Sequence, residues 1–349
     1  MTENLNQDLL LRLLTTPGVS GREQRIREVV APELGSLTDS LRTDRLGNLI
    51  GHRPGSGPKV MLCAHMDTIG FLVQHVDGDG FIRLMPVGGF DPRTLVHQRV
   101  MVCGRRDLVG VISPAQPPIH LLDKDDRKKS PKMEDLFVDV MLPADEVREL
   151  VSVGDQVVMH RTAHLSDRAI VSPYLDDRLG IYILLETLRR ANTTADIFPV
   201  ISVLEEVNLR GAATSTFGVE PDLAVVIDTA IAADLPGSNS GANKINALGD
   251  GAILTVMDSR TISDPRLISH FRSVAEENSI PYGLEALDCG GTDASGIQSV
   301  GAGVPVIAVG PATRYVHTSN ETALLEDVES TIRLLVAFLE GAQELELSW

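Results

Sequence analysis

The sequence has few cysteines, no long apolar run and a shortage of basic residues relative to acidic ones. Its 349 residues include three cysteines, Cys63, Cys103 and Cys289. Such a sparse, odd set argues against a disulfide framework and fits reduced thiols in a cytosol. Lysine and arginine number 31 against 48 aspartates and glutamates, which gives a net charge of −17. Nucleic acids and anionic membranes bind basic surfaces, so neither is an expected partner.

The sequence also shows no pattern typical of a membrane span or of an export signal. No apolar stretch is long enough to cross a bilayer, and the first seven residues lack the basic start and apolar core of a signal peptide. We therefore expect a cytoplasmic protein. The composition is otherwise ordinary for a globular protein, with 43% apolar and 23% charged residues. The length suffices for a large core and two domains.

Residues 1–67 and 166–349 carry the pattern of one α/β domain, in which apolar strands alternate with helices. Strands are expected at 41–51 (a pair), 59–64, 198–204, 222–228, 252–257 and 304–309. Helices are expected at 6–14, 20–33, 172–190, 265–278 and 327–340, with a further short helix that follows strand 198–204 and ends at residue 217. Continuous apolar strands such as 200–204 are typical of a central sheet covered by helices on both faces. Ser20 followed by Glu23 predicts a capping box at the start of the second helix.

Between residues 68 and 165 the texture changes to short strands separated by Gly, Asp and Pro. This pattern predicts a small all-β unit, barrel-like or PDZ-like, inserted into the α/β domain. Within it, residues 120–135 are highly charged with few core-forming side chains, which favours a mobile surface loop. The predicted fold class is thus α/β, with a mixed central sheet and an inserted β-rich domain.

Metal-capable side chains stand at or just beyond the ends of the predicted strands. The set is His65, Glu205, Glu206, Asp228 and His317, with Asp176 at the start of a helix. Each has an ordinary explanation when taken alone, such as a solvated glutamate pair or an N-cap aspartate. In open α/β sheets, however, ligands bind beyond the carboxyl ends of the strands. We therefore expect these side chains to meet at one site.

The chemistry of the set favours divalent metal ions. Two histidines, two aspartates and a glutamate offer nitrogen and oxygen ligands that suit zinc, and also cobalt or manganese. If one aspartate bridges, two ions share a hydroxide, and one glutamate stays free beside it, as a general base requires. Neighbouring strand residues point to opposite faces, so Glu205 and Glu206 both reach the site only if the strand has already ended.

Seven motifs, in order along nearly the whole chain, resemble the glutamyl and tetrahedral (TET) aminopeptidase family of di-metal exopeptidases. They are A-H-M-D-T-I-G-F (64–71), P-V-G-G-F-D-P (86–92), L-D-D-R-L-G (175–180), E-E-V-N-L-R-G-A (205–212), I-D-T-A-I-A-A-D-L-P-G (227–237), G-G-T-D-A (290–294) and R-Y-V-H-T (314–318). The sequence departs from the family at Thr68, normally acidic, at Asn208, normally glycine, and at Asp288-Cys289. None of these departures removes a ligand, although Asn208 suggests an altered turn beside Glu206.

The resemblance implies a role for each site residue. The metal ligands would be His65, Asp176 (bridging), Glu206, Asp228 and His317. Glu205 would be the general base, and Asp67 would orient the ring of His65. The Asp176–Asp177 peptide bond would be cis. The inserted domain would mediate homodimers and larger assemblies, commonly tetrahedral dodecamers, with the charged loop near a neighbouring subunit's active site.

These implications predict a metal-dependent aminopeptidase that removes the N-terminal residue of peptides, with zinc ahead of cobalt or manganese as the ion. Three alternatives stay open. A hydrolase of acyl-blocked N-termini needs the same ligands. A glycosidase using Glu205 and Glu206 needs two carboxylates but no paired histidines, and a catalytically silent scaffold needs neither. The preferred N-terminal residue is also open, because no cationic pocket for an acidic residue can be assigned.

Overall fold

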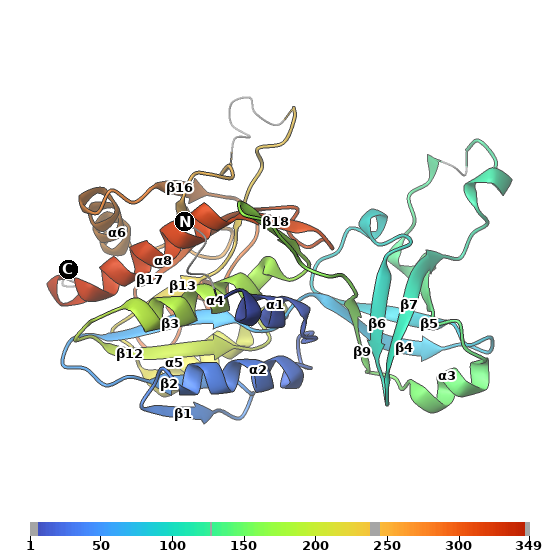
Figure 1. Cartoon of the computed structure of the whole chain (residues 1–349), viewed down its shortest axis with the longest axis horizontal. Coiled ribbons are helices and arrows are strands. Elements are labelled where there is room, and N and C mark those ends of the chain that lie inside the picture. Colours follow the sequence, from blue (N-terminus) through green and yellow to red (C-terminus); the bar gives the residue numbers. More distant parts are fainter. Residues whose placement is uncertain (1–5, 126–127, 238–244, 346–349) are drawn as a thin grey trace.

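The molecule has two parts, an α/β body and a smaller β-barrel beside it (Figure 1). The computed structural model describes residues 6–125, 128–237 and 245–345. The helices are α1 (Gln7–Thr15), α2 (Gln24–Gly35), α3 (Ala144–Leu150), α4 (Leu175–Arg190), α5 (Arg210–Val219), α6 (Pro265–Glu277), α7 (Asp293–Gln298) and α8 (Leu325–Glu340), with 3-10 turns η1 (Pro92–Thr94), η2 (Ile119–Leu121), η4 (Met133–Asp135) and η6 (Ala342–Glu344).

The body is built on one large mixed sheet. Its strands run in the order β1 (Ser40–Thr43), β2 (Leu49–His52), β12 (Asp196–Ser202), β3 (Lys59–His65), β13 (Leu223–Ile227), β17 (Val306–Arg314), β18 (Glu321–Leu324), β11 (Ala169–Ser172) and β10 (His164–Leu165). Off this path, β14 (Ala230–Ile231) and β15 (Ala252–Met257) pair with β17, and β16 (Tyr282–Ala286) pairs with β15. β12, β3, β13 and β17 are mutually parallel, so their carboxyl ends share one edge. Antiparallel strands flank this parallel centre.

Helices cover both faces of the sheet, which explains the continuous apolar strands. Along β3, Val60, Leu62 and Ala64 pack into one cluster with side chains of α1, α2, α4 and α8. The alternate residues Met61 and Cys63 pack into a second cluster with α5 and α7. From Val60 to His65 every residue of β3 is therefore buried, as a parallel sheet between two helix layers requires.

Local signals account for the helices that hold this core. In α6, the side chain of Asp264 accepts a hydrogen bond from the backbone N–H of Arg266, and Pro265 occupies the first turn. Leu267, Phe271 and Ala275 then repeat at helical spacing on the buried face. Asn6 caps α1 in the same way, by accepting from Leu9.

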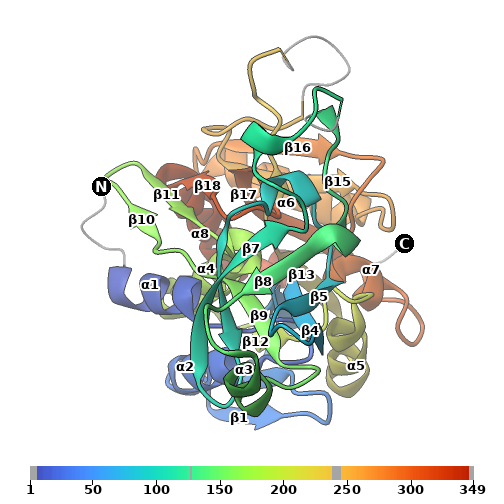
Figure 2. The ribbon, with the colours of Figure 1, turned by 90° about the vertical axis from the view of Figure 1, so that its right-hand side faces the viewer.

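The second part is a closed barrel with the strand order β4-β5-β8-β7-β6-β9. Its strands are β4 (Gly70–Val76), β5 (Ile82–Val87), β6 (Arg99–Cys103), β7 (Asp107–Pro114), β8 (Leu136–Asp139) and β9 (Gln156–Met159), and α3 lies between the last two. It has its own apolar core. Figure 2, in which the barrel side of the molecule faces the viewer, shows the barrel in front of the α/β body. The predicted fold class is confirmed, although several short elements were not anticipated, among them β8 and α3 in the barrel and β11, β16, β18 and α7 in the α/β body.

Several local expectations were wrong. Ser20 does not cap a helix: its hydroxyl donates to Asp67 (2.6 Å), α2 begins at Gln24, and the Glu23 carboxylate accepts from the N–H of Gly21. The helix expected from residue 172 starts at Leu175, because Ser172 ends β11. Strand β17 continues to Arg314, five residues beyond its expected end. Tertiary pairing decided each of these ends.

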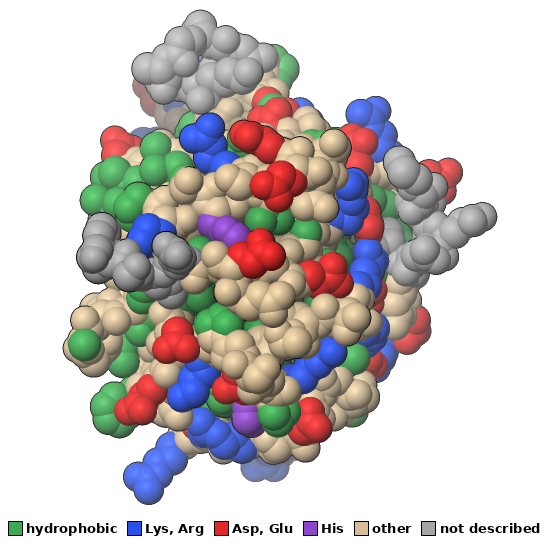
Figure 3. All heavy atoms as spheres, turned by 90° about the vertical axis from the view of Figure 1, so that its left-hand side faces the viewer, with side chains coloured by type: hydrophobic (Ala, Val, Ile, Leu, Met, Phe, Trp, Pro, Cys, Tyr) green, Lys and Arg blue, Asp and Glu red, His purple; other side chains and the backbone are tan. Residues whose placement is uncertain are grey.

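The remaining sequence features can be located only in part. Residues 126–127 of the charged loop and residues 1–5 at the N-terminus lie outside the described residues, and the loop's mobility stays a prediction. All three cysteines are free, and only Cys289 is exposed. On the face opposite the barrel, acidic and basic side chains are interspersed (Figure 3). No helix within the described ranges is long and apolar enough to cross a bilayer.

Candidate metal and catalytic site

The predicted site residues meet at the carboxyl edge of the parallel strands. His65 is the last residue of β3 and pairs in register with Ser202, the last residue of β12. Asp228 directly follows β13, and His317 follows β17. Asp176 comes to the same place from the first turn of α4. Residues more than 250 positions apart are thus brought together, as the rule for ligand sites in α/β sheets predicts.

Two groups of potential ligands share one aspartate. His65, Asp176 and Asp228 form one group, and Asp176, Glu206 and His317 form the other; within each group the ligand atoms lie within 4.8 Å of one another. Asp176 Oδ1 is 3.2 Å from His65 Nε2, and its Oδ2 is 3.3 Å from His317 Nε2. The two oxygens of one carboxylate therefore face separate histidines, and the nitrogen and oxygen donors fit divalent zinc, cobalt or manganese.

Glu205 lies beside these groups without belonging to either. Its Oε2 is 4.0 Å from His65 Nε2, and only 7% of the residue is exposed. Burial raises the pKa of Glu205 well above its usual value; the charge of His65 opposes this shift and that of Asp228 adds to it. A buried carboxyl group with a raised pKa is suited to accept and return a proton.

Negative charge is crowded at this site. Burial raises the pKa of Asp228 and of Glu206, and the neighbouring Asp176 carboxylate adds to both shifts. Burial also opposes ionisation of Asp176, but hydrogen bonds with His317 and His65 outweigh it and lower its pKa. Burial would lower the pKa of His317, yet Asp176 and Glu206 raise it to about 11. Bound cations would relieve this accumulation of carboxylates.

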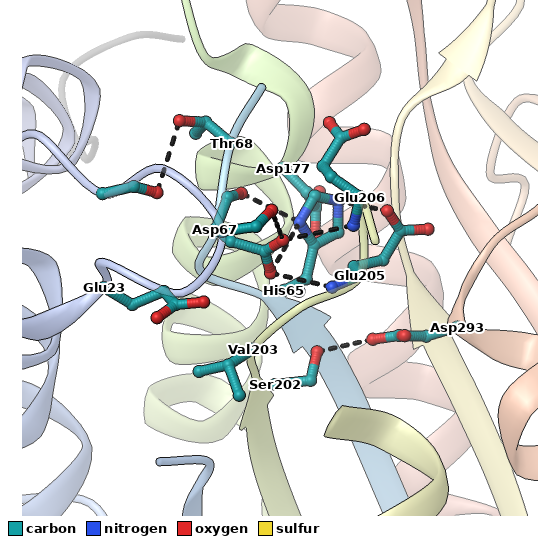
Figure 4. Close-up of polar contacts among 12 residues, drawn as sticks. Glu23, His65, Asp67, Thr68, Asp177, Ser202, Val203, Glu205, Glu206 and Asp293 are labelled. Carbon is teal, nitrogen blue, oxygen red and sulfur yellow. Dashed lines mark hydrogen bonds and ion pairs between the residues drawn. The ribbon is translucent and has the colours of Figure 1, made fainter. Parts of the chain in front are cut away.

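Asp67 contacts the site through two different groups. Its backbone carbonyl is 3.0 Å from His65 Nδ1, whereas its carboxylate lies 3.8 Å from that nitrogen. The carboxylate instead accepts the backbone N–H groups of Glu205 and Glu206, both at 3.1 Å (Figure 4). It also accepts the hydroxyl of Ser20. The ring of His65 is therefore oriented by a peptide oxygen, and the carboxylate holds the two glutamates.

A tight turn allows both glutamates to face the site. β12 ends at Ser202, before Glu205, and the backbone then takes positive φ angles at Leu204 (57°), Asn208 (67°) and Leu209 (57°). Asparagine tolerates this left-handed conformation better than most residues. Asn208 therefore preserves a turn that glycine would also make.

A sequence model of M42 glutamyl aminopeptidase matches residues 47–334 of the chain. The chain belongs to this family. Membership in the M42 family places it among the peptide-bond hydrolases of the aminopeptidase type.

Individual relatives resemble this M42 member over almost its whole length. The lysyl aminopeptidase of Pyrococcus furiosus is 33% identical, with 98% of this chain and 99% of that protein covered. A solved aminopeptidase from Desulfurococcus kamchatkensis is 35% identical, with a TM-score of 0.91 and coverage of 98% and 97%. The TET1 peptidase of Pyrococcus horikoshii, which can assemble into a tetrahedron or a large octahedral shell, is 30% identical, with a TM-score of 0.85 and coverage of 95% and 98%.

Sequence reasoning missed Glu321, which ties two of the M42 site residues together. Its carboxylate accepts the backbone N–H of Asp176 (3.0 Å) and that of His317 (2.8 Å). The residue is 2% exposed, and burial raises its pKa to about 8. An acidic residue opening the apolar strand β18 was the available signal. The predicted cis peptide bond between Asp176 and Asp177 is present. The carboxylate of Asp177 accepts the backbone N–H of His65 (3.1 Å).

A cavity of about 420 Å³ opens over the M42 site. Its lining includes His65, Asp176, Glu205, Glu206, Asp228 and His317, together with the Gly290–Thr292 segment. The proposed ligands and the proposed base therefore face one space that a substrate can enter. Thr68, one of the departures from the family pattern, is buried outside this lining and contacts Gly18.

Proposed function

We propose that the chain is a metal-dependent aminopeptidase that hydrolyses the first peptide bond of unblocked peptides, with two divalent metal ions and Glu205 as the general base. The proposed ligands are His65, Asp176, Glu206, Asp228 and His317. The observation that supports this proposal is the pair of donor groups that share Asp176, with a third carboxyl group left free beside them. Zinc is the first choice of ion, and the same donors would accept cobalt or manganese.

The roles of the protein groups follow from their positions. When bound, the ions would polarise the scissile carbonyl and lower the pKa of the attacking water. Glu205 would take a proton from that water and pass it to the leaving nitrogen. The carboxylate of Asp67 would hold Glu205 in place by accepting a hydrogen bond from the backbone N–H of Glu205. Asp176, held by Glu321, would keep its two oxygens directed at both histidines.

The test uses chromogenic aminoacyl substrates, unblocked and acetyl-blocked, with protein stripped by a chelator and refilled with zinc, cobalt or manganese. We expect cleavage of unblocked substrates only after metal returns. Glu205→Gln should lower kcat by about 10²- to 10⁴-fold while metal content, measured by atomic emission, stays at two ions per chain.

Other outcomes would point to the alternatives. Cleavage of blocked substrates alone would favour an acyl-peptide hydrolase. Glycoside hydrolysis that survives chelation would favour the glycosidase. Two bound metals with no hydrolysis of any substrate would leave a silent scaffold. A matched control, Glu220→Gln, removes an exposed acid outside the cavity and should keep wild-type rates.

The proposal extends to assembly and location. We propose that residues 68–165 form a dimerisation domain and that the chain is a homo-oligomer, in line with the assembly of the TET1 relative. Apolar side chains exposed on the barrel and its loops are compatible with such contacts: Met85, Val109, Leu121, Met141 and Val153. The free cysteines accord with a cytoplasmic location, which stays a prediction.

A further inference from the structure

The cavity is also lined by residues on and next to β15 and β16. These strands pair in parallel, with Thr255 opposite Glu285. Asp258 directly follows β15. Thr255, Asp258 and Glu285 line the same cavity as His65 and Asp176. The metal-binding groups and two further acids thus border one continuous space.

Glu285 is a buried carboxyl group whose protein partners are all neutral. It is 6% exposed. Its Oε1 accepts the hydroxyl of Thr255 (3.0 Å), and its Oε2 accepts the side-chain N–H of Asn246. Burial raises its pKa and the nearby Asp258 adds to this shift, while the hydrogen bonds from Thr255 and Asn246 oppose it.

Asp258 carries an oxygen that nothing in the protein satisfies. The residue is 5% exposed; its Oδ1 accepts the backbone N–H groups of Arg260 (2.7 Å) and Thr261 (2.6 Å), while its buried Oδ2 has no hydrogen-bond partner. A buried carboxylate oxygen without a partner is costly to desolvate. Because Asp258 borders the cavity, a cationic occupant that reaches this oxygen would supply that partner.

No positive side chain of the described ranges forms an ion pair with either acid. The side chain of Arg260 is exposed and lies against Gly291, although its backbone N–H reaches Asp258. Among the residues that the structure describes, this part of the cavity lining therefore carries two acidic groups and no cation paired with either of them. Such a site attracts a positive ligand and repels a negative one.

The other walls suit a long aliphatic stem. Apolar side chains also line the cavity: Ile231, Leu287, Ala308, Val309 and Val316. Lysine and arginine place methylene groups along apolar surface and keep their charge at a polar end. An apolar substrate side chain would fill the same space but leave Asp258 Oδ2 unpaired.

We propose that this cavity selects peptides whose N-terminal residue is lysine or arginine, with Asp258 and Glu285 binding the cationic end of that side chain. The inference rests on the proposed aminopeptidase function and names its substrate class. A charge-assisted hydrogen bond contributes about 1.5–3 kcal/mol, so one such contact corresponds to roughly a 10- to 100-fold preference.

The first experiment compares lysyl with norleucyl aminomethylcoumarin on the metal-loaded wild-type protein. Norleucine has the same four-carbon chain without the ammonium group. We expect kcat/KM to be roughly 10- to 100-fold higher for lysine, with arginine close to lysine and glutamate poorest. An equal or better rate for norleucine or glutamate would overturn the inference and leave the aminopeptidase proposal standing. Failure to cleave any unblocked substrate would instead remove the function on which it rests.

The second experiment assigns the preference to the two acids. In Glu285→Gln and in Asp258→Asn, the lysine-to-norleucine ratio of kcat/KM should fall towards one, mainly through a higher KM for lysine. The ratio within one variant cancels any loss of folded enzyme, and metal content should stay at the wild-type value. The control Glu277→Gln removes an exposed acid at the end of α6 and should keep the wild-type ratio. Unchanged ratios in both cavity variants would contradict the assignment.

Discussion

At the scale of single residues, Asp67 shows how one side chain supports a site from outside it. It is fully buried, and its carboxylate accepts three hydrogen bonds, from Ser20 and from the backbone of Glu205 and Glu206. Ionised carboxylates bind such donors more strongly than neutral amides do. The charge of Asp67 therefore sets the position of the proposed base and of its neighbour.

Asp67→Asn should weaken this arrangement without removing a proposed metal ligand. The amide offers one acceptor oxygen to three donors, so we expect a loss of about 1–3 kcal/mol in the free energy of unfolding and a lower kcat. Ser20→Ala removes only one of the three contacts and should cost less in both measurements. Denaturant titration and steady-state kinetics check this, and a wild-type kcat in Asp67→Asn would contradict the positioning role.

At the scale of elements, the turn between β12 and α5 decides where the two glutamates point. Three residues of this turn have positive φ, and none of them is glycine. This unfavourable backbone conformation persists because hydrogen bonds fix the turn at both ends. The N–H of Gly211 donates to the carbonyl of Val203, and the N–H of Leu209 donates to the carbonyl of Glu205. Backbone strain at functional sites persists where surrounding contacts hold it.

Substitutions at Asn208 should report on this strain. Asn208→Gly should change the free energy of unfolding by less than about 1 kcal/mol, because both residues tolerate positive φ. Asn208→Val should lower it by about 1–2 kcal/mol and reduce kcat, because the turn beside Glu206 must shift. Thermal unfolding and kinetics of the two variants provide the comparison. Equal stability of the valine and glycine variants would show that the turn is not restrictive.

The first turn of α8 offers a pH-dependent contribution to stability. Asp327 accepts the backbone N–H groups of Gly249 (2.8 Å) and Gly251 (2.9 Å), yet burial raises its pKa from the usual 3.8 to about 6. The folded protein then holds this proton more tightly than the unfolded chain, so its contribution to stability decreases as pH rises from about 4 to 6.

We expect the difference in unfolding free energy between wild type and Asp327→Asn to shrink across this pH range, because the amide does not titrate. Denaturant titrations at several pH values measure this difference, and Asp8→Asn, an exposed acid on α1, serves as the control. A difference that stays constant from pH 4 to pH 6 would contradict the raised pKa.

At the scale of the whole molecule, buried carboxyl groups gather at the carboxyl edge of the central parallel strands. Folding brings Asp176, Glu205, Glu206 and Asp228 together with only two histidines among them. Ions that bind only the folded state stabilise it by mass action. The proposed metals would therefore act on the stability of the entire body as well as on catalysis.

Stripping metal from the protein should lower its Tm by roughly 5 °C or more, and refilling should restore it. Asp176→Asn lacks the ligand shared by both donor groups, so its Tm should respond much less to the chelator. Scanning calorimetry checks both statements, and equal responses of the variant and the wild type would argue against Asp176 as a shared ligand.

Assembly is a second property of the whole molecule. If the barrel mediates dimers, light scattering should give a mass of at least twice 37.6 kDa, and a higher even multiple for a cage. A mass equal to one chain at micromolar concentration would contradict the proposed dimerisation role of residues 68–165.

The sequence alone was enough to predict the layered α/β body, the inserted β unit and the ligand candidates. Continuous apolar strands end at His65, before Glu205 and at Asp228. Both the strand ends and the metal-capable side chains can be recognised from neighbouring residues in the sequence, so no tertiary information is needed to predict them. The resemblance of the spaced motifs to one family then supplied their expected roles.

Only the tertiary structure decided which atoms face one another. Ser20 looked like a helix cap because the pattern is local, but its partner is Asp67, 47 positions away. Asp258 and Glu285 gave no local signal, and Glu321 gave only that of an acidic residue at the start of a strand. Their significance depends on burial, on missing partners and on the pairing of β15 with β16. Burial and pairing are properties of the folded chain, so the shape and charge of the cavity could be recognised only after folding had brought its walls together.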